Sequence, residues 1–218
     1  MDFIIDNLPR FLGGAWLTIQ LVLFSSTFGL IMALPIALAR LSRNPALNAP
    51  ATAYVFFFRG TPLLAQIFLI YYGSGQFRHE LNAIGLWAFF RDPWFCALLS
   101  LTLNTAAYTS EILRGAIQAV LLPRAIGIGW PAYTNEVVYQ IQATSLVSII
   151  TIMDITGVAR AVGARDFTFF EAFGLAALLY LILVYGFIFA AKRIEKRLNA
   201  HLVRPDVARQ RKLAGSAI

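Results

Sequence analysis

The chain has 218 residues, of which 59% are hydrophobic and only 13% are charged. A soluble domain carries about 25% charged residues, so too few remain here to cover a surface that faces water. This composition excludes an ordinary soluble enzyme, a disordered chain and a coiled coil. The single cysteine, Cys96, excludes a disulfide framework and a multi-cysteine zinc site, and the two histidines are far apart in the sequence. We therefore expect no metal site.

The sequence contains no glycine-rich phosphate loop followed by a lysine, and no zinc-protease or serine-hydrolase motif. We therefore expect no catalytic residues, no ATP site and no other cofactor on this chain.

Five apolar stretches are long enough, or nearly so, to cross a bilayer as helices, which takes about 20 residues each. The sequence predicts an all-α, multi-pass membrane protein with a single transmembrane domain and a basic tail at residues 192–218. Breaks are expected at Arg59–Pro62 and at Gly127–Pro131, because proline lacks a backbone N–H and glycine loosens the chain. The five expected helical segments cover about residues 11–39, 51–77, 93–118, 132–153 and 172–191.

Lysine and arginine are distributed unequally between the two sides that five spans would create. Twelve of the 18 basic residues fall on the side of the C-terminus and five on the side of the N-terminus. Since basic residues favour the cytoplasmic side, we expect the N-terminus in the periplasm and the C-terminus in the cytoplasm. The basic tail is then a topology anchor rather than a nucleic-acid site.

Polar residues recur along the fourth segment at helical spacing. Glu136, Gln140, Thr144, Ser148 and Thr151 follow one another at intervals of four, four, four and three residues, which places them on one helix face. This stripe favours either a substrate path or hydrogen bonding between helices. For Glu136, a place in the first helical turn, where the helix dipole favours a carboxylate, is the alternative to substrate binding.

The third segment carries a second polar face. Asn104, Tyr108 and Glu111 lie at spacings of four and three, and Glu111 has Arg114 three residues further on. We predict a local ion pair for Glu111 and an interior position for Asn104 and Tyr108. Gln66 stands alone among apolar residues of the second segment, where a bond between helices and a path position are both open.

Several motifs, in the same order along the chain, resemble those of permease subunits of polar amino acid ABC importers. The similarity covers roughly residues 15–197 and is strongest to the M-type subunits of histidine, octopine and nopaline systems, which lie in the inner membrane of Gram-negative bacteria. The motifs are Phe58–Gln66 (FRGTPLLAQ), Leu103–Gly115 (LNTAAYTSEILRG), Leu122–Ala125 (LPRA), Pro131–Glu136 (PAYTNE) and Ala143–Leu146 (ATSL).

The resemblance implies the core of a type I ABC importer permease. Two such subunits, identical or one of them a Q-type relative, would form a pore in the lipid bilayer. A dimer of ATPase subunits would bind ATP beneath it, and a periplasmic substrate-binding protein would deliver the substrate.

In the family, the helix that matches Asn135 and Glu136 lines the path. A carboxylate there suits a basic amino acid or an opine, although Ala143 stands where some relatives have an acidic residue. Taken together, the polar pattern and the resemblance place the substrate path at Asn135, Glu136, Gln140, Thr144, Ser148, Asn104, Tyr108 and Gln66.

One family element has no counterpart in this sequence. After Val120 the family continues with a cytoplasmic stretch that contains a Glu-Ala-Ala motif and docks into the ATPase, whereas here Val120 is followed directly by Leu121, Leu122 and Pro123. We predict weak ATPase docking and poor coupling of transport. The expected coupling region comprises Arg114, Val120, Leu121, Pro123 and Arg124.

Three other classes of protein are alternatives to the permease. A subunit of an ion-coupled secondary transporter would use charges near the bilayer centre, but Glu111, Glu136 and Asp154 lie towards segment ends. A membrane scaffold without a path would use the polar stripe for packing alone. An intramembrane enzyme would need a catalytic group of residues, which the sequence does not display.

Overall fold

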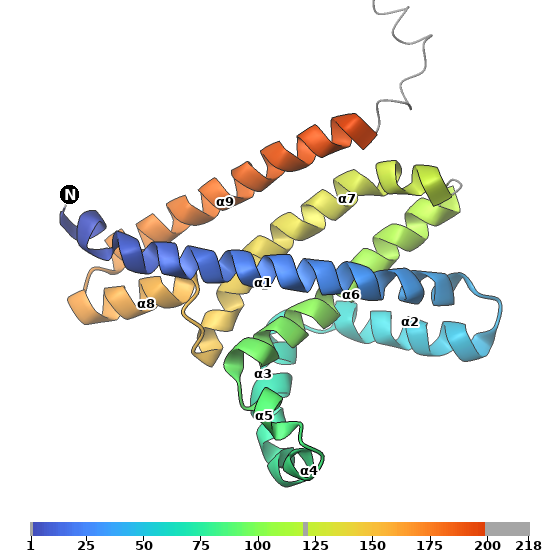
Figure 1. Ribbon diagram of the computed structural model, residues 1–218, viewed down its shortest axis with the longest axis horizontal. Helices are drawn as coiled ribbons and strands as arrows, with labels where there is room; N and C mark the ends of the chain where they lie inside the picture. Colours follow the sequence, from blue (N-terminus) through green and yellow to red (C-terminus); the bar gives the residue numbers. More distant parts are fainter. Residues whose placement is uncertain (1, 120–121, 199–218) are drawn as a thin grey trace, which may run out of the picture.

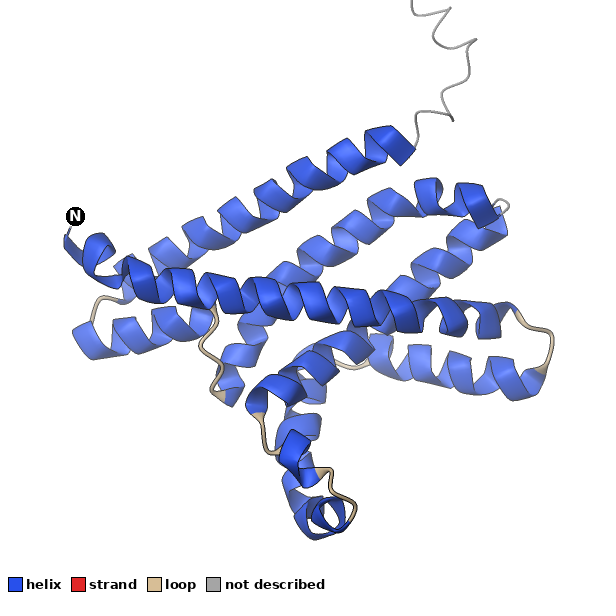
Figure 2. Ribbon diagram, in the orientation of Figure 1, coloured by secondary structure: helices blue, strands red, loops and turns tan. Residues whose placement is uncertain are grey.

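The computed structural model describes residues 2–119 and 122–198, with side chains for 3–119 and 127–198. Every element in these ranges is helical, as the all-α prediction requires, and Figure 2 shows the helices joined by short loops. In chain order the elements are α1 (Asp2–Leu41), α2 (Pro45–Gly60), α3 (Leu63–Ser74), η1 (Gly75–Phe77), α4 (Arg78–Ala83), α5 (Trp87–Phe90), α6 (Pro93–Ala119), α7 (Leu122–Ala143), η2 (Thr144–Ile150), α8 (Ile155–Asp166) and α9 (Phe169–Leu198).

Helix α1 runs the length of the molecule and contacts most of the other long helices (Figure 1). Its 40 residues span about 60 Å at 1.5 Å per residue, roughly twice the hydrocarbon thickness of a bilayer. Close packing on α6 is possible because Gly29 has no side chain: a Cβ there would lie 2.9 Å from Cγ2 of Thr105. The other helices pack around this long central element.

Two helices, Phe3–Leu41 and Phe169–Leu198, are each long and apolar enough to cross a membrane. Two bent pairs qualify when each pair is taken together, Pro45–Gly60 with Leu63–Ala83 at 103° and Gly127–Ile150 with Ile155–Asp166 at 48°. The described residues thus hold two to four candidate spans by length and composition. Helix α6 has 27 residues but is less apolar, because many of its buried residues are serine, threonine or asparagine.

The first predicted break is confirmed. Helix α2 ends at Gly60, Thr61 is extended at φ −115° and ψ 145°, and α3 starts after Pro62 in a new direction. Because Pro62 has no N–H to give to the preceding turn, the chain can leave the helix there without losing a further hydrogen bond.

The second predicted break, at Gly127–Pro131, is wrong. Helix α7 continues through Pro131 because its neighbours hold it on both sides. Trp130 donates its indole N–H to the carbonyl oxygen of Ala191 in α9 at 3.0 Å, and a Cβ at Gly129 would lie 3.4 Å from that of Ala116 in α6. Packed neighbours allow a membrane helix to tolerate the one hydrogen bond that proline removes.

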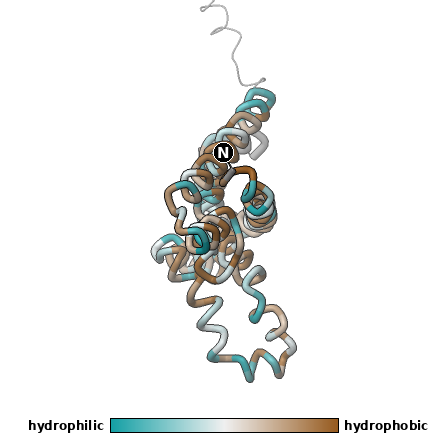
Figure 3. Tube along the Cα trace, turned by 90° about the vertical axis from the view of Figure 1, so that its left-hand side faces the viewer, coloured by the Kyte–Doolittle hydropathy of each residue, from teal (hydrophilic) through white to brown (hydrophobic). Residues whose placement is uncertain are grey.

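Beyond Ala143 the helix tightens into the 3₁₀ helix η2, and Thr151 ends it with a left-handed φ of 69°. Helix α8, which the sequence did not predict, then leads to α9. Two apolar cores result, one between α1, α3, α6 and η2 and the other between α1, α8 and α9. Figure 3 shows hydrophilic residues gathered at the C-terminal end of α9.

Replacing Gly29 by leucine should separate α1 from α6, since the new side chain would overlap Thr105. Overpacking of this kind costs about 1–3 kcal/mol of stability. Thermal unfolding of the detergent-solubilised protein measures the effect. Gly13→Leu in the same helix is the control, because a Cβ at Gly13 meets nothing within 4 Å; equal melting temperatures for both variants would contradict the close α1–α6 contact.

Candidate functional site

The polar stripe of α7 exists, but it is shorter than predicted. Glu136, Gln140, Thr144 and Ser148 are all buried, with exposed fractions between 0% and 8%. Thr151 is exposed and does not belong to the stripe, because the α-helix ends before it and its backbone is left-handed. The stripe therefore joins residues of α7 with the start of η2.

Glu136 is the one acidic residue of this stripe. It lies well inside α7, so the alternative that places it in the first helical turn is wrong. Its side chain is 8% exposed, and its Oε1 has no hydrogen-bond partner among the described residues. A carboxylate in such a place is costly unless a ligand or another chain meets it. The adjacent Asn135 is exposed on the surface of α7.

Gln140 points towards α1 rather than into an open space. Its Nε2 donates to Oγ of Ser25 at 2.8 Å, and that hydroxyl in turn donates to the carbonyl of Leu21 at 2.6 Å. Thr144, one turn further, donates to the carbonyl of Ile141. Within the single chain, Gln140 thus bonds α7 to α1, and Ser25 is a partner that the sequence analysis missed. Its only signal is a hydroxyl pair, Ser25 and Ser26, inside an apolar run.

Gln66 and Asn104 come together at the break between α2 and α3. Nε2 of Gln66 donates to the carbonyls of Phe58 and Thr61 at 2.9 and 3.1 Å and to the Thr61 hydroxyl at 2.8 Å. Nδ2 of Asn104 donates to Oε1 of Gln66 at 3.1 Å. These two amides satisfy the carbonyls that the break releases and tie them to α6.

Glu111 is held by three arginines. The predicted pair with Arg114 is confirmed, with Nε of Arg114 2.8 Å from Oε1 of Glu111. Arg40, at the end of α1, also binds Oε1, and Nη1 of Arg59, near the end of α2, lies 3.3 Å from Oε2. Neither of these two partners was predicted, because each comes from a distant part of the sequence. The guanidinium of Arg59 also stacks over Tyr108, with Cζ 5.2 Å from the ring centroid.

Tyr108 links this charged group to α7 through Tyr139, which lies beside the polar stripe. Its ring lies 6.4 Å from that of Tyr139 and is partly exposed, as the side of a path would require. Asp154, in contrast, has a structural role, because it accepts hydrogen bonds from the N–H of Gly157 and from the hydroxyl of Tyr180, both at 2.9 Å. It thereby caps α8.

The expected coupling region is only partly described. Helix α6 ends at Ala119 and α7 begins at Leu122, while Val120 and Leu121 lie outside the described residues. Pro123 and Arg124 belong to α7, and their side chains also lie outside the described part. Within the described ranges no three histidine, cysteine or acidic side chains come together as a metal site would require.

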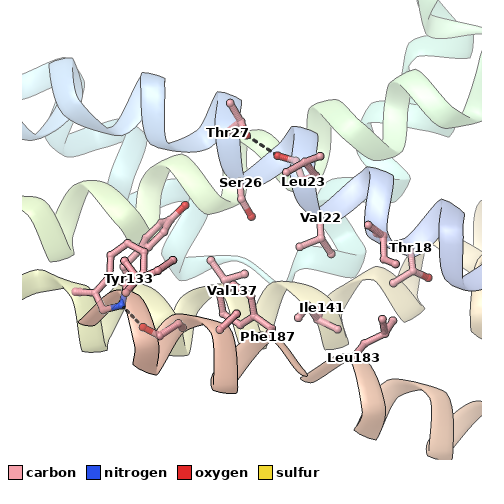
Figure 4. Close-up of a pocket in the computed structure, with 15 residues that line it drawn as sticks. Thr18, Val22, Leu23, Ser26, Thr27, Tyr133, Val137, Ile141, Leu183 and Phe187 are labelled. Atoms are coloured by element: carbon pink, nitrogen blue, oxygen red, sulfur yellow. Dashed lines mark hydrogen bonds between the residues drawn. The ribbon is translucent and has the colours of Figure 1, made fainter. Parts of the chain in front are cut away.

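A cavity of about 400 Å³ lies between α1, α7 and α9, and Figure 4 shows its lining. Tyr133, Val137 and Ile141 face it from α7, opposite Val22 of α1 and Phe187 of α9. Val137 and Ile141 each follow a stripe residue by one position, so they lie on a neighbouring side of α7 and not on the stripe itself. The cavity is mainly apolar and is therefore not the space that the stripe faces.

Comparison with known proteins identifies the class. No family model matches the chain, but curated relatives do. The nopaline transport system permease protein NocM of Agrobacterium fabrum is 41% identical over 93% of both chains. The histidine/lysine/arginine/ornithine transport system permease protein HisM of Escherichia coli K12 is 37% identical over 90% of this chain and 91% of its own. A crystal structure of an amino acid ABC transporter matches with a TM-score of 0.80 and 27% identity, over 89% of this chain and 96% of that one.

The helices and their buried polar groups are thus those of a membrane-spanning transport subunit. The chain belongs to the family of amino acid and opine ABC transporter permeases, as its motifs predicted. It is a multi-pass membrane protein of a bacterial ABC importer. Permease subunits are not enzymes and carry no cofactor; ATP is bound by a separate ATPase, and a substrate-binding protein completes the system.

The relatives are longer within the aligned region. The alignment with the nopaline permease has 224 positions yet covers only 93% of these 218 residues, so roughly twenty of its positions have no counterpart here. The alignment with the E. coli permease has 219 positions for 90% of the chain and gives a similar difference. This chain is therefore internally shorter than both relatives.

Replacing Asn104 by leucine should destabilise the protein, because Gln66 and the Phe58 carbonyl lose a donor. Hydrogen bonds between membrane helices contribute about 0.6 kcal/mol on average and up to about 1.7. A double-mutant cycle with Gln66→Leu measures the coupling by unfolding in detergent. Asn135→Leu, at an exposed asparagine, is the matched control. Strict additivity of the two buried substitutions would contradict the network.

Proposed function

We propose that this chain forms half of the pore of an importer for cationic amino acids or opines, and that Glu136 binds the positive group of the substrate. The observation that carries the proposal is the buried carboxylate of Glu136, whose Oε1 lacks a partner in the described chain. An ammonium or guanidinium that passes along α7 would supply the missing charge and donor.

The relatives support this choice of substrate. One is named for nopaline and the other for histidine, lysine, arginine and ornithine, and such molecules carry a cationic or basic nitrogen group. The remaining path residues would be Asn135, Thr144, Ser148 and Tyr108. Gln140, Asn104 and Gln66 would hold the helices that form the wall, since each is hydrogen-bonded to another helix, whereas Thr144 donates only to its own turn.

We also propose that the pore is completed by a second permease subunit, either a Q-type relative or an identical copy. The buried carboxylate of Glu136 would then face a passage that both subunits line. Residues 1–218 would form one transmembrane domain with a basic cytoplasmic tail at 192–218. The periplasmic position of the N-terminus is supported by the arginine and lysine distribution, since Arg40, Arg43 and the basic end of α9 fall on the more basic side.

We further propose that coupling to the ATPase is weakened in this chain. Only Val120 and Leu121 separate α6 from α7, and the relatives carry about twenty residues more within the aligned region. The coupling stretch of the family is expected between these helices. Without it, Arg114, Pro123 and Arg124 would be left to make the contact with the ATPase.

Neutralising Glu136 tests the substrate proposal. Glu136→Gln keeps the shape but removes the charge, so binding of radiolabelled arginine or nopaline to the purified full-length chain should weaken about tenfold, equivalent to about 1.4 kcal/mol. Glu171→Gln, at an exposed glutamate in the first turn of α9, is the matched control. Unchanged affinity in Glu136→Gln together with unchanged affinity in the control would remove Glu136 from the site.

Restoring the coupling stretch tests the second proposal. Insertion of the corresponding residues of the nopaline permease after Val120 should raise recovery of the ATPase subunit in a pull-down and raise ATP-driven uptake in proteoliposomes. The unmodified chain, assayed with the same ATPase and binding protein, is the comparison. Full recovery and full uptake by the unmodified chain would show that coupling does not need this stretch.

A further inference from the structure

The arginine group around Glu111 borders a pocket on the surface between α1 and α2. The pocket has a volume of about 320 Å³ and opens to the outside of the helix bundle. Its lining combines two guanidinium groups with apolar side chains. The lining residues are Arg40, Thr52, Val55, Phe56, Arg59 and Gly60.

The charges at this pocket do not balance within the described chain. Arg40, Arg59 and Arg114 all bind the same carboxylate, that of Glu111. Glu136 of α7 is the next acid within Coulombic range of Arg59, so two acids face three bases and a net positive charge remains in a partly buried place. Nε of Arg40 is also buried without a hydrogen-bond partner in the part of the chain that the structure describes. Buried charge of this kind is stabilised by an anion that approaches the free guanidinium donors.

The surroundings of the pocket indicate where the anion comes from. Phe56 and Phe57 of α2 are 80% and 46% exposed beside the two arginines, which is typical of a surface in contact with lipid. Arg40 lies in the last turn of α1, close to the turn into α2, so the pocket lies near one end of this long helix (Figure 1). A basic pocket at a helix end, flanked by exposed phenylalanine side chains, has the composition of the boundary between lipid headgroups and acyl chains.

We infer that the pocket between α1 and α2 binds a phosphate group, and that Arg40 and Arg59 are its donors, with the headgroup of an anionic phospholipid as the form that the membrane supplies. Two guanidinium groups can share the oxygens of one phosphate diester. Glu111 holds both arginines in place from the side of α6, and Val55 and Phe56 contact the glycerol and acyl region. Basic pockets between membrane helices bind anionic headgroups in this way. The inference does not rest on the proposed function, although Arg59 also lies within Coulombic range of Glu136.

Lipid binding to the full-length chain in detergent tests the inference by native mass spectrometry. Dioctanoyl phosphatidylglycerol should give adducts at least fivefold more abundant than dioctanoyl phosphatidylcholine at equal concentration. Arg59→Gln should reduce the phosphatidylglycerol adduct about tenfold, because Arg59 is partly exposed and its loss leaves the Arg40 and Arg114 pairs with Glu111 intact. Arg43→Gln, at an exposed arginine just beyond α1 that does not line the pocket, is the matched control and should leave the adduct unchanged.

Competition with inorganic phosphate distinguishes a lipid headgroup from free phosphate as the source of the bound phosphate group. If millimolar phosphate displaces the lipid and itself protects the protein against thermal unfolding in an Arg59-dependent way, the pocket binds free phosphate as well as lipid. If it does not, the lipid headgroup alone is the ligand. Equal adducts with both lipids, or equal losses in Arg59→Gln and Arg43→Gln, would overturn the inference. Far-ultraviolet circular dichroism confirms that Arg59→Gln is folded.

Discussion

The structure depends on one constraint: a polar group within a lipid-embedded bundle must find its partner inside the protein. At the break between α2 and α3, the amides of Gln66 and Asn104 bind the released carbonyls of Phe58 and Thr61. Without these donors the 103° bend would leave bare carbonyls in an apolar setting. The bend, and hence the direction of α3 and the loop beyond it, follows from this pairing.

Among the buried side-chain atoms without a partner in the described ranges, two belong to charged groups. Oε1 of Glu136 on α7 and Nε of Arg40 on α1 are both buried without partners in the described ranges. The first lies among the motifs of the permease family and suits a cation in transit. The second lies at the end of a helix and suits an anion from the membrane. The two groups have opposite charge, so each requires a ligand group of the opposite sign.

Helix α1 connects these places mechanically. It packs on α6 at Gly29, and Ser25 accepts a hydrogen bond from Gln140 of α7. Arg40, at its end, forms an ion pair with Glu111 of α6. A movement of α6 and α7 relative to each other would therefore strain the contacts of α1 between Ser25 and Arg40. The junction between α6 and α7, at which we propose that coupling is weakened, therefore joins two helices that α1 holds together.

The sequence by itself determined the helical membrane class, the family and the break at Pro62, because hydrophobic length, motif order and proline chemistry are local properties. It also located the polar stripe, but it assigned Thr151 to the stripe and a break to Pro131, since helix type and neighbouring support depend on packing. Only the tertiary structure decided that Ser25 faces Gln140 and that Arg40 and Arg59 meet at Glu111. Those partners lie far apart in the chain, and spacing along one helix carries no information about which other helix will face it.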